Sequence, residues 1–113
     1  KCYSEKIHNE KIKLPQLIDK ATGVWHQYVI RCEERDALKK YLEEKGIGTI
    51  IHYPIPPHLS EAYSYLGYSE GSFPITEHLA KTVLSIPIYD FLNTVSKMTE
   101  EEQNYVIDAI NCF

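Results

Sequence analysis

The sequence predicts an α+β domain in which a small, mostly antiparallel three-stranded sheet is covered by helices on one face. Segments rich in β-branched and aromatic residues occur at 24–31, 47–53 and 84–87, which is typical of short strands. Between and after them, apolar residues recur at helical spacing, most clearly at 35–45 and 100–113. The length of 113 residues is that of one small domain with a modest core.

The first predicted strand covers residues 24–31, where apolar and polar residues alternate with the period of a strand. The residues before it, 1–13, are polar with weak periodicity and are expected to be a helix remnant or a disordered lead-in. A helix is predicted over 35–45, because Leu38 and its apolar neighbours share one face. Gly46 follows the last turn, where glycine commonly ends a helix.

Three elements are predicted in the middle of the chain. Residues 47–53 are expected to form the second strand, which a proline-rich loop ends, because proline cannot continue a central ladder. A short helix is predicted over 60–66, with its first residue, Ser60, as the N-cap. Thr76 is expected to cap another helix over 77–83.

The last part of the chain contains the clearest signal. The third strand is predicted at 84–87, followed by a loop over 88–97. Thr99 and Glu102 have the spacing of a capping box, in which each side chain bonds the other residue's backbone N–H. The sequence therefore predicts a C-terminal helix that begins after Thr99.

Composition and charge exclude several classes of protein. A net charge of −4 without a basic stripe disfavours nucleic-acid binding, and no apolar run reaches the roughly 20 residues that cross a bilayer. Cys2, Cys32 and Cys112 are far apart and odd in number, as expected for free thiols of a cytoplasmic protein. Nine tyrosines are typical of a domain that docks on another domain, and those at 63, 65 and 68 are expected in the core and at such an interface.

The most concentrated set of polar and aromatic side chains lies between His52 and His58. Three prolines within four residues restrict this loop, so its side chains can be held at a fixed place. Either histidine is equally well explained by structure: His52 by a bond to a nearby carbonyl at a strand end, and His58 by capping of the next helix. No third ligand has a suitable spacing, so a metal site is not predicted.

The order and spacing of short motifs carry more information than any single one. They run His26-x-Tyr28-Val29-Ile30-Arg31, Arg35-Asp36, Gly46-Ile47-x-Thr49, His52-Tyr53-Pro54-x-Pro56, Phe73-Pro74-x-x-Glu77 and Leu84-Ser85-Ile86-Pro87. In this order they closely resemble the C-terminal small domain of the DegT/DnrJ/StrS family of sugar aminotransferases. The resemblance covers roughly residues 25–113.

The resemblance implies a particular domain organisation and cofactor. Residues 1–23 would be a linker or helix remnant from a missing N-terminal large domain, and residues 24–113 the small lid domain of a fold type I enzyme. Members of the family use pyridoxal phosphate, which a lysine of the large domain binds. No motif for that lysine is present, so the fragment alone is expected to bind no cofactor, to contain no catalytic residue and to be inactive.

The resemblance also implies substrates and partners. The full-length enzyme would transfer an amino group from an amino acid, with glutamate the expected donor, to a nucleotide-linked keto-sugar. The product would serve cell-surface polysaccharide or lipopolysaccharide biosynthesis in a bacterium, and the enzyme would act as a homodimer. His52, Tyr53 and His58 are the expected substrate-binding residues. A stand-alone α+β module for ligand binding or dimerisation is the alternative.

Overall fold

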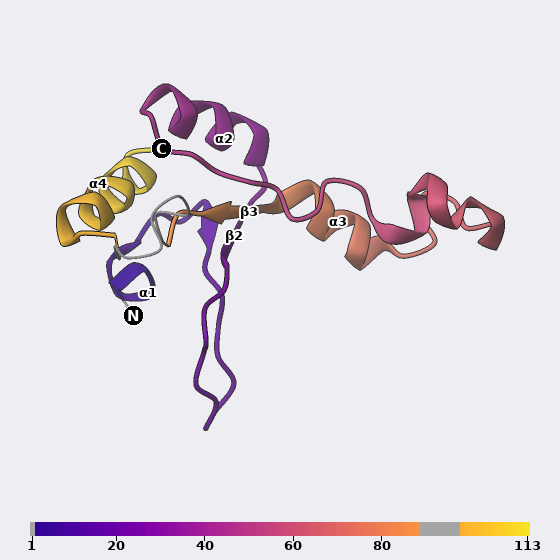
Figure 1. Ribbon diagram of the computed structural model, residues 1–113, viewed down its shortest axis with the longest axis horizontal. Coiled ribbons are helices and arrows are strands. Elements are labelled where there is room, and N and C mark those ends of the chain that lie inside the picture. Colours follow the sequence, from indigo (N-terminus) through magenta and orange to yellow (C-terminus); the bar gives the residue numbers. More distant parts are fainter. Residues whose placement is uncertain (1, 89–97) are drawn as a thin grey trace.

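The computed structural model describes residues 2–88 and 98–113 (Figure 1). In chain order the elements are α1 (Cys2–Lys6), β1 (Ile12–Lys13), β2 (Tyr28–Cys32), α2 (Arg35–Glu44), the 3₁₀ helices η1 (Pro57–Leu59) and η2 (Glu61–Leu66), α3 (Pro74–Thr82), β3 (Val83–Ile86) and α4 (Glu100–Asn111). All but the first residue of the loop predicted at 88–97 lies outside the described residues. No helix in the described ranges has the length and apolar character needed to cross a membrane.

The three strands form one antiparallel sheet in the order β1–β2–β3. In the register of the central strand, Tyr28 lies opposite Ile86 and Ile30 lies opposite Leu84. The strand is shorter than the predicted 24–31, because residues 24–27 lie outside it and it ends at Cys32. Within it the predicted alternation holds, since Tyr28, Ile30 and Cys32 are buried while Arg31 is exposed. The α+β class and the antiparallel three-stranded sheet are therefore confirmed.

The membership of the sheet differs from the prediction. Residues 47–53 do not form a strand; within this segment Ile50 alone makes a bridge, to Ser85 at the free edge of β3. Only Ile47 of the segment is buried, and Ile50 is 59% exposed. β-branched residues favour strands only where they fit a half-buried pleated surface, and here one bridge is all that the edge provides.

The third strand of the sheet is β1, which the sequence did not indicate. It has two residues, Ile12 and Lys13, paired with Cys32 and Arg31. Of the two alternatives predicted for residues 1–13, a helix remnant or a disordered lead-in, the structure has a helix, at Cys2–Lys6. Tyr3 of this helix is buried in the core. So short a polar segment carries no periodic signal, and its conformation is set by tertiary pairing.

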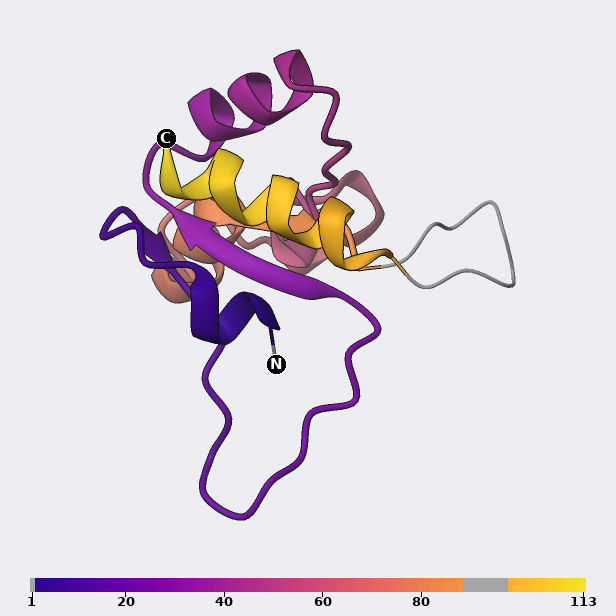
Figure 2. The same cartoon turned by 90° about the vertical axis from the view of Figure 1, so that its left-hand side faces the viewer.

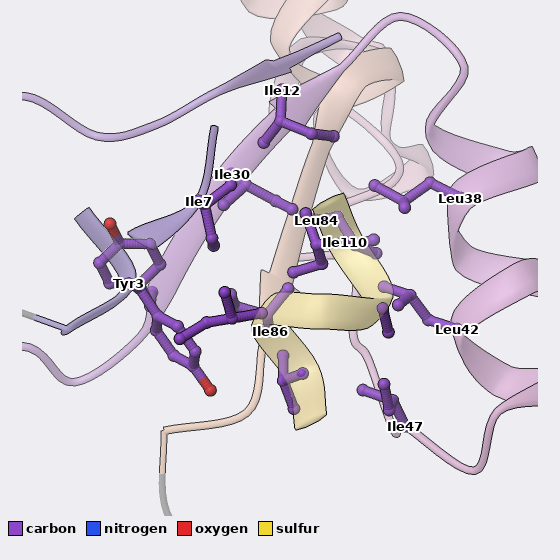
Figure 3. Close-up of a cluster of buried hydrophobic side chains, with 14 of the residues drawn as sticks. Tyr3, Ile7, Ile12, Ile30, Leu38, Leu42, Ile47, Leu84, Ile86 and Ile110 are labelled. Carbon is purple, nitrogen blue, oxygen red and sulfur yellow. The ribbon is translucent and has the colours of Figure 1, made fainter. Parts of the chain in front are cut away.

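One face of the sheet carries the core (Figure 3). Figure 2 shows α2 and α4 lying over β2, with α1 beside them. Ile30, Leu38, Leu42, Leu84 and Ile110 have no measurable exposure and come from four different elements. On the opposite face Lys13 and Arg31 are exposed, while Val29 and Val83 are half-buried and line a hollow together with Leu79 of α3.

The predicted helix ends are correct where local chemistry decides them. Gly46 has φ +74°, the left-handed conformation expected after a helix, and the Thr99–Glu102 capping box is formed in both directions. Thr76 is not a cap: α3 begins two residues earlier, at Pro74, because proline is favoured in the first turn. Ser60 makes no cap bond, and its hydroxyl donates to the Pro57 carbonyl at 2.8 Å between two 3₁₀ helices.

Two segments project from the sheet (Figure 1). One is the connection between β1 and β2, whose apolar residues Ile18 and Val24 are 81% and 97% exposed. The other, which we call the aromatic arm, comprises residues 57–73 and extends beyond α3 along the longest axis. Its exposed large apolar residues are Leu59, Tyr63, Tyr65, Leu66, Tyr68 and Phe73. The prediction of a core position for the three arm tyrosines is therefore wrong.

Candidate functional site

The segment that carries the candidate residues begins at the free edge of β3. Ile50 and Ser85 exchange both backbone hydrogen bonds, with N···O distances of 3.1 and 2.8 Å. This pair fixes the point along β3 at which the chain leaves the sheet, two residues before His52. The proline-rich loop then crosses to η1 and the aromatic arm.

His52 is half-buried, and its Nδ1 lies 2.9 Å from the Ser85 hydroxyl oxygen. The sequence left open a bond from His52 to a carbonyl; its partner is instead a hydroxyl on the neighbouring strand. A ring held at one nitrogen has a defined orientation, and the other nitrogen stays available. The ring also meets that of Tyr53 edge to face, with centroids 5.7 Å apart.

Tyr53 is the most accessible of the three candidates. Its side chain is 73% exposed, and its hydroxyl has no hydrogen-bond partner among the residues that the structure describes. A phenol in this position can donate or accept a hydrogen bond. It is therefore free to bind a polar group from outside the described residues.

His58 is placed very differently. Its side chain is 8% exposed, and its Nε2 lies 3.0 Å from Oε1 of Glu77, whose side chain is 9% exposed. The His58 ring also packs edge to face on Phe73, with centroids 4.8 Å apart. The structure thus brings His52 and Tyr53 together and places His58 in a separate cluster at the base of the aromatic arm.

Glu77 is the centre of that cluster. Its carboxylate accepts hydrogen bonds from the backbone N–H of Gly71 at 2.9 and 3.0 Å and from that of Phe73 at 3.1 Å, besides its contact with His58. These backbone donors, together with His58, hold the pKa of Glu77 below its usual value of 4.5, although burial acts in the opposite direction. The carboxylate therefore ties η1, the end of the arm and α3 together.

Sequence reasoning missed the roles of Ser85 and Glu77. Ser85 is the single polar residue in the run Val83–Ile86, and a polar side chain inside a buried strand is a signal that it has a hydrogen-bond partner. Glu77 stands out in the sequence only as part of the motif Phe73-Pro74-x-x-Glu77. A carboxylate is favourable in the first turn of a helix, but the partners of Glu77 outside α3 come from η1 and from residues 71–73, which no spacing in the sequence indicates.

The described residues do not form a site for a metal or for a carbonyl cofactor that needs a lysine. No group of three or more potential metal ligands occurs within residues 2–88 and 98–113. In the same ranges every lysine is exposed except Lys39, which is half-buried and lies 3.7 Å from Glu43. A Schiff-base lysine needs a desolvated pocket that shifts its pKa, and these side chains have none.

Known proteins resemble this chain over nearly its whole length. The sequence model of the DegT/DnrJ/EryC1/StrS aminotransferase family matches residues 1–111. The dTDP-3-amino-3,6-dideoxy-alpha-D-galactopyranose transaminase of Aneurinibacillus thermoaerophilus is 43% identical over 96% of this chain and 28% of its own length. The dTDP-3-amino-3,4,6-trideoxy-alpha-D-glucose transaminase of Streptomyces venezuelae is 46% identical over 88% of this chain and 24% of its own length.

Solved structures agree with the sequence comparison. The crystal structure of S. venezuelae DesV in complex with a ketimine intermediate superposes with a TM-score of 0.84 and 36% identity, over 97% of this chain and 28% of that one. An aminotransferase of the same family from Brucella abortus gives a TM-score of 0.79 and 34% identity. The chain thus spans about a quarter of the length of the relatives it matches. Sequence, fold and motif order together assign the chain to the DegT/DnrJ/EryC1/StrS aminotransferase family.

Proposed function

We propose that this chain is the C-terminal small domain of an aminotransferase that moves an amino group from an amino acid to a nucleotide-linked keto-sugar. The family match over residues 1–111 carries this proposal, and the relatives named as transaminases of dTDP-linked amino sugars support it. The spore coat polysaccharide biosynthesis protein SpsC of Bacillus subtilis, 30% identical over 85% of the chain, supports a role in cell-surface polysaccharide synthesis. The activity belongs to the longer protein.

Pyridoxal phosphate is the cofactor that we propose for that longer protein. When bound, it supplies an electron sink for carbon–nitrogen chemistry, and the protein supplies binding and orientation. The described residues of this chain do not fit it, because their lysines lie in solvent or on exposed helix faces. We therefore assign cofactor binding to the N-terminal part of the full-length enzyme and derive no step through it here.

While the N-terminal part of the enzyme binds the cofactor, the loop from His52 to His58 of this domain contributes contacts to the sugar nucleotide. Tyr53 would hydrogen-bond a sugar hydroxyl or a diphosphate oxygen, and its exposure with an unoccupied hydroxyl supports this role. His52 would assist through Nε2, since Nδ1 faces Ser85. Any direct contact by His58 would use its other ring nitrogen, because Nε2 faces Glu77.

The exposed apolar residues of the aromatic arm support a second part of the proposal, which is that this domain docks on another protein surface. Single exposed apolar residues are ordinary, but a contiguous set is typical of an interface. The large domain of the same enzyme and the second subunit of a homodimer are the surfaces that we propose. The stand-alone module expected as the alternative would instead bind a ligand or self-associate as the 113-residue chain, which light scattering with a ligand thermal-shift screen would detect.

The test of the proposal uses the full-length protein. It is loaded with pyridoxal phosphate and assayed with dTDP-3-amino-3,6-dideoxy-alpha-D-galactopyranose and 2-oxoglutarate, with glutamate formation as the readout. We expect turnover, and we expect Tyr53→Phe to lower kcat/KM by roughly tenfold, the loss of one hydrogen bond in a closed site. Tyr105→Phe is the matched control, because Tyr105 is 54% exposed and its hydroxyl donates to the Lys45 carbonyl, away from the loop and the arm.

Two results would contradict the proposal at different levels. No glutamate formation with this amino sugar or with other dTDP- and UDP-linked amino sugars would refute the activity. Turnover that Tyr53→Phe and His52→Ala leave unchanged would refute the role of the loop and leave the activity in place.

A further inference from the structure

We propose that Ser85 and Glu77 are positioning residues that fix the two ends of the loop 52–58 and thereby hold Tyr53 at one place in the substrate site. The inference rests on the proposed function, because it concerns the same loop. It goes beyond it in assigning a role to two residues outside the loop, on β3 and α3. The evidence is a pair of side-chain contacts that engage the first and the last residue of the loop.

The first contact anchors the start of the loop. Ser85 bonds Ile50 through both of its backbone groups and faces Nδ1 of His52 with its hydroxyl, so one residue of β3 holds both the residue at which the chain leaves the sheet and the first residue of the loop. Ser85 is 8% exposed, which means that few water molecules can replace it as a partner. The orientation of the His52 ring, and with it the Tyr53 ring packed against it, follows from this hydroxyl.

The second contact anchors the end of the loop. Glu77 lies in the first turn of α3 and faces Nε2 of His58, while its carboxylate also accepts from the backbone of Gly71 and Phe73. A carboxylate on α3 that is bonded from two other segments, η1 and the end of the arm, has little freedom to move. Hydrogen bonds to an ionised acceptor are about twice as strong as neutral ones, so the contact resists local opening.

The chain between the two anchors has too little conformational freedom to compensate for a movement of either end. Pro54, Pro56 and Pro57 fix three φ angles, and Pro56 is buried. With both ends held and the middle stiffened, the 73% exposed side chain of Tyr53 has a defined position. Contacts made by a preorganised group lose less entropy on binding than those made by a mobile loop.

The experiment uses the full-length protein and the dTDP-amino-sugar assay described above. Ser85→Ala removes the hydroxyl and keeps the backbone pairing, and Glu77→Gln keeps the shape and removes one acceptor. We expect each variant to lower kcat/KM by roughly tenfold, because a displacement of about 1 Å suffices for such a loss. The controls are Thr22→Ala and Glu10→Gln, two exposed residues outside the loop and the aromatic arm, which should stay within about twofold.

A double-mutant cycle separates positioning from general stability. If Ser85 and Glu77 act through Tyr53, then either substitution in the Tyr53→Phe background should have less than about a third of its effect in the wild type, because residues that act as a unit are not additive. A structural role alone would give the same loss in both backgrounds. Thermal unfolding of each variant shows whether the fold is retained.

Hydrogen–deuterium exchange reports the anchors without any substrate. In Glu77→Ala, peptides that cover residues 69–73 should exchange at least about tenfold faster, since the amides of Gly71 and Phe73 lose their acceptor, and Glu10→Ala, at an exposed position, should leave them unchanged. Unchanged exchange, kcat/KM within about twofold of the wild type, or additive effects with Tyr53→Phe would each overturn the inference. A protein without transaminase activity would refute the proposed function, and the exchange experiment would still decide whether the loop is anchored.

Discussion

The N-terminal segment makes a testable contribution to the core that its polar sequence does not suggest. Tyr3 is 6% exposed, its hydroxyl donates to the Pro87 carbonyl at 2.7 Å, and its ring lies 5.2 Å from that of Tyr28. Replacing Tyr3 by alanine removes an aromatic side chain that packs against Tyr28 of β2 and lies next to Pro87 and Met98. We expect this single change to destabilise the whole domain.

The magnitude follows from the buried area. An aromatic side chain buries roughly 150–250 Å², which at about 25 cal/mol per Å² corresponds to roughly 4–6 kcal/mol. The unfolded chain already buries part of that area, so we expect Tyr3→Ala to lower the free energy of unfolding by about 3–4 kcal/mol. Tyr3→Phe keeps the ring and loses the bond to Pro87, which should lower it by about 1 kcal/mol.

Urea unfolding of the 113-residue chain measures these values. Trp25 is its single tryptophan and lies 5.1 Å from the Tyr28 ring, so its fluorescence reports the same region. Tyr65→Ala, at an exposed position, should change the free energy of unfolding by less than about 0.5 kcal/mol. A loss below about 1 kcal/mol for Tyr3→Ala would refute the reasoning, because the core would then not depend on the first residues. The predicted boundary between residues 23 and 24 would gain support from that result.

Three further outcomes are expected. Thr99→Ala should lower the free energy of unfolding by about 1 kcal/mol through loss of the capping box, whereas Thr76→Ala, at a position that caps nothing, should be nearly neutral in the same urea titration. Because the pKa of Glu77 is lowered in the folded state, its stabilisation is present above pH 4.5 and is lost as the pH falls through the folded-state value; acid titrations of the wild type and Glu77→Gln should therefore converge at low pH. Gly46→Ala should lower the free energy of unfolding by about 1 kcal/mol, because a side chain is strained at φ +74°. A Cβ added at this position would meet no non-adjacent atom within 4 Å, so no steric clash should add to that loss. A larger loss in thermal unfolding would contradict this account.

Much of the fold followed from local rules. Three features depend on residues only a few positions apart and can therefore be predicted from the sequence. They are the helix α2 with its Gly46 terminus, the capping box before α4 and the alternation within β2. The failures share a different origin. β1 exists because β2 pairs with it, and residues 47–53 fall short of a strand because β3 offers them one bridge.

The candidate site divides in the same way. The spacing of His52, Tyr53 and His58, with the prolines between them, singles out this loop in the sequence as the candidate substrate-binding segment. It could not show that the two histidines face side chains from β3 and α3, because Ser85 and Glu77 are 33 and 19 positions away from their partners. Nor could it show that Tyr53 would be the accessible member, since exposure depends on what packs nearby.

The family, the class of fold and the loop in which the candidate chemistry lies can all be inferred from the order of residues along the chain. They depend on short motifs, on helix periodicity and on the fixed φ angles of prolines, which act over short distances. Which strands make the sheet, which nitrogen of each histidine has a partner and which side chain is exposed become known from the folded chain. Those properties depend on hydrogen bonds and packing between distant segments, whose partners are chosen when the whole core forms.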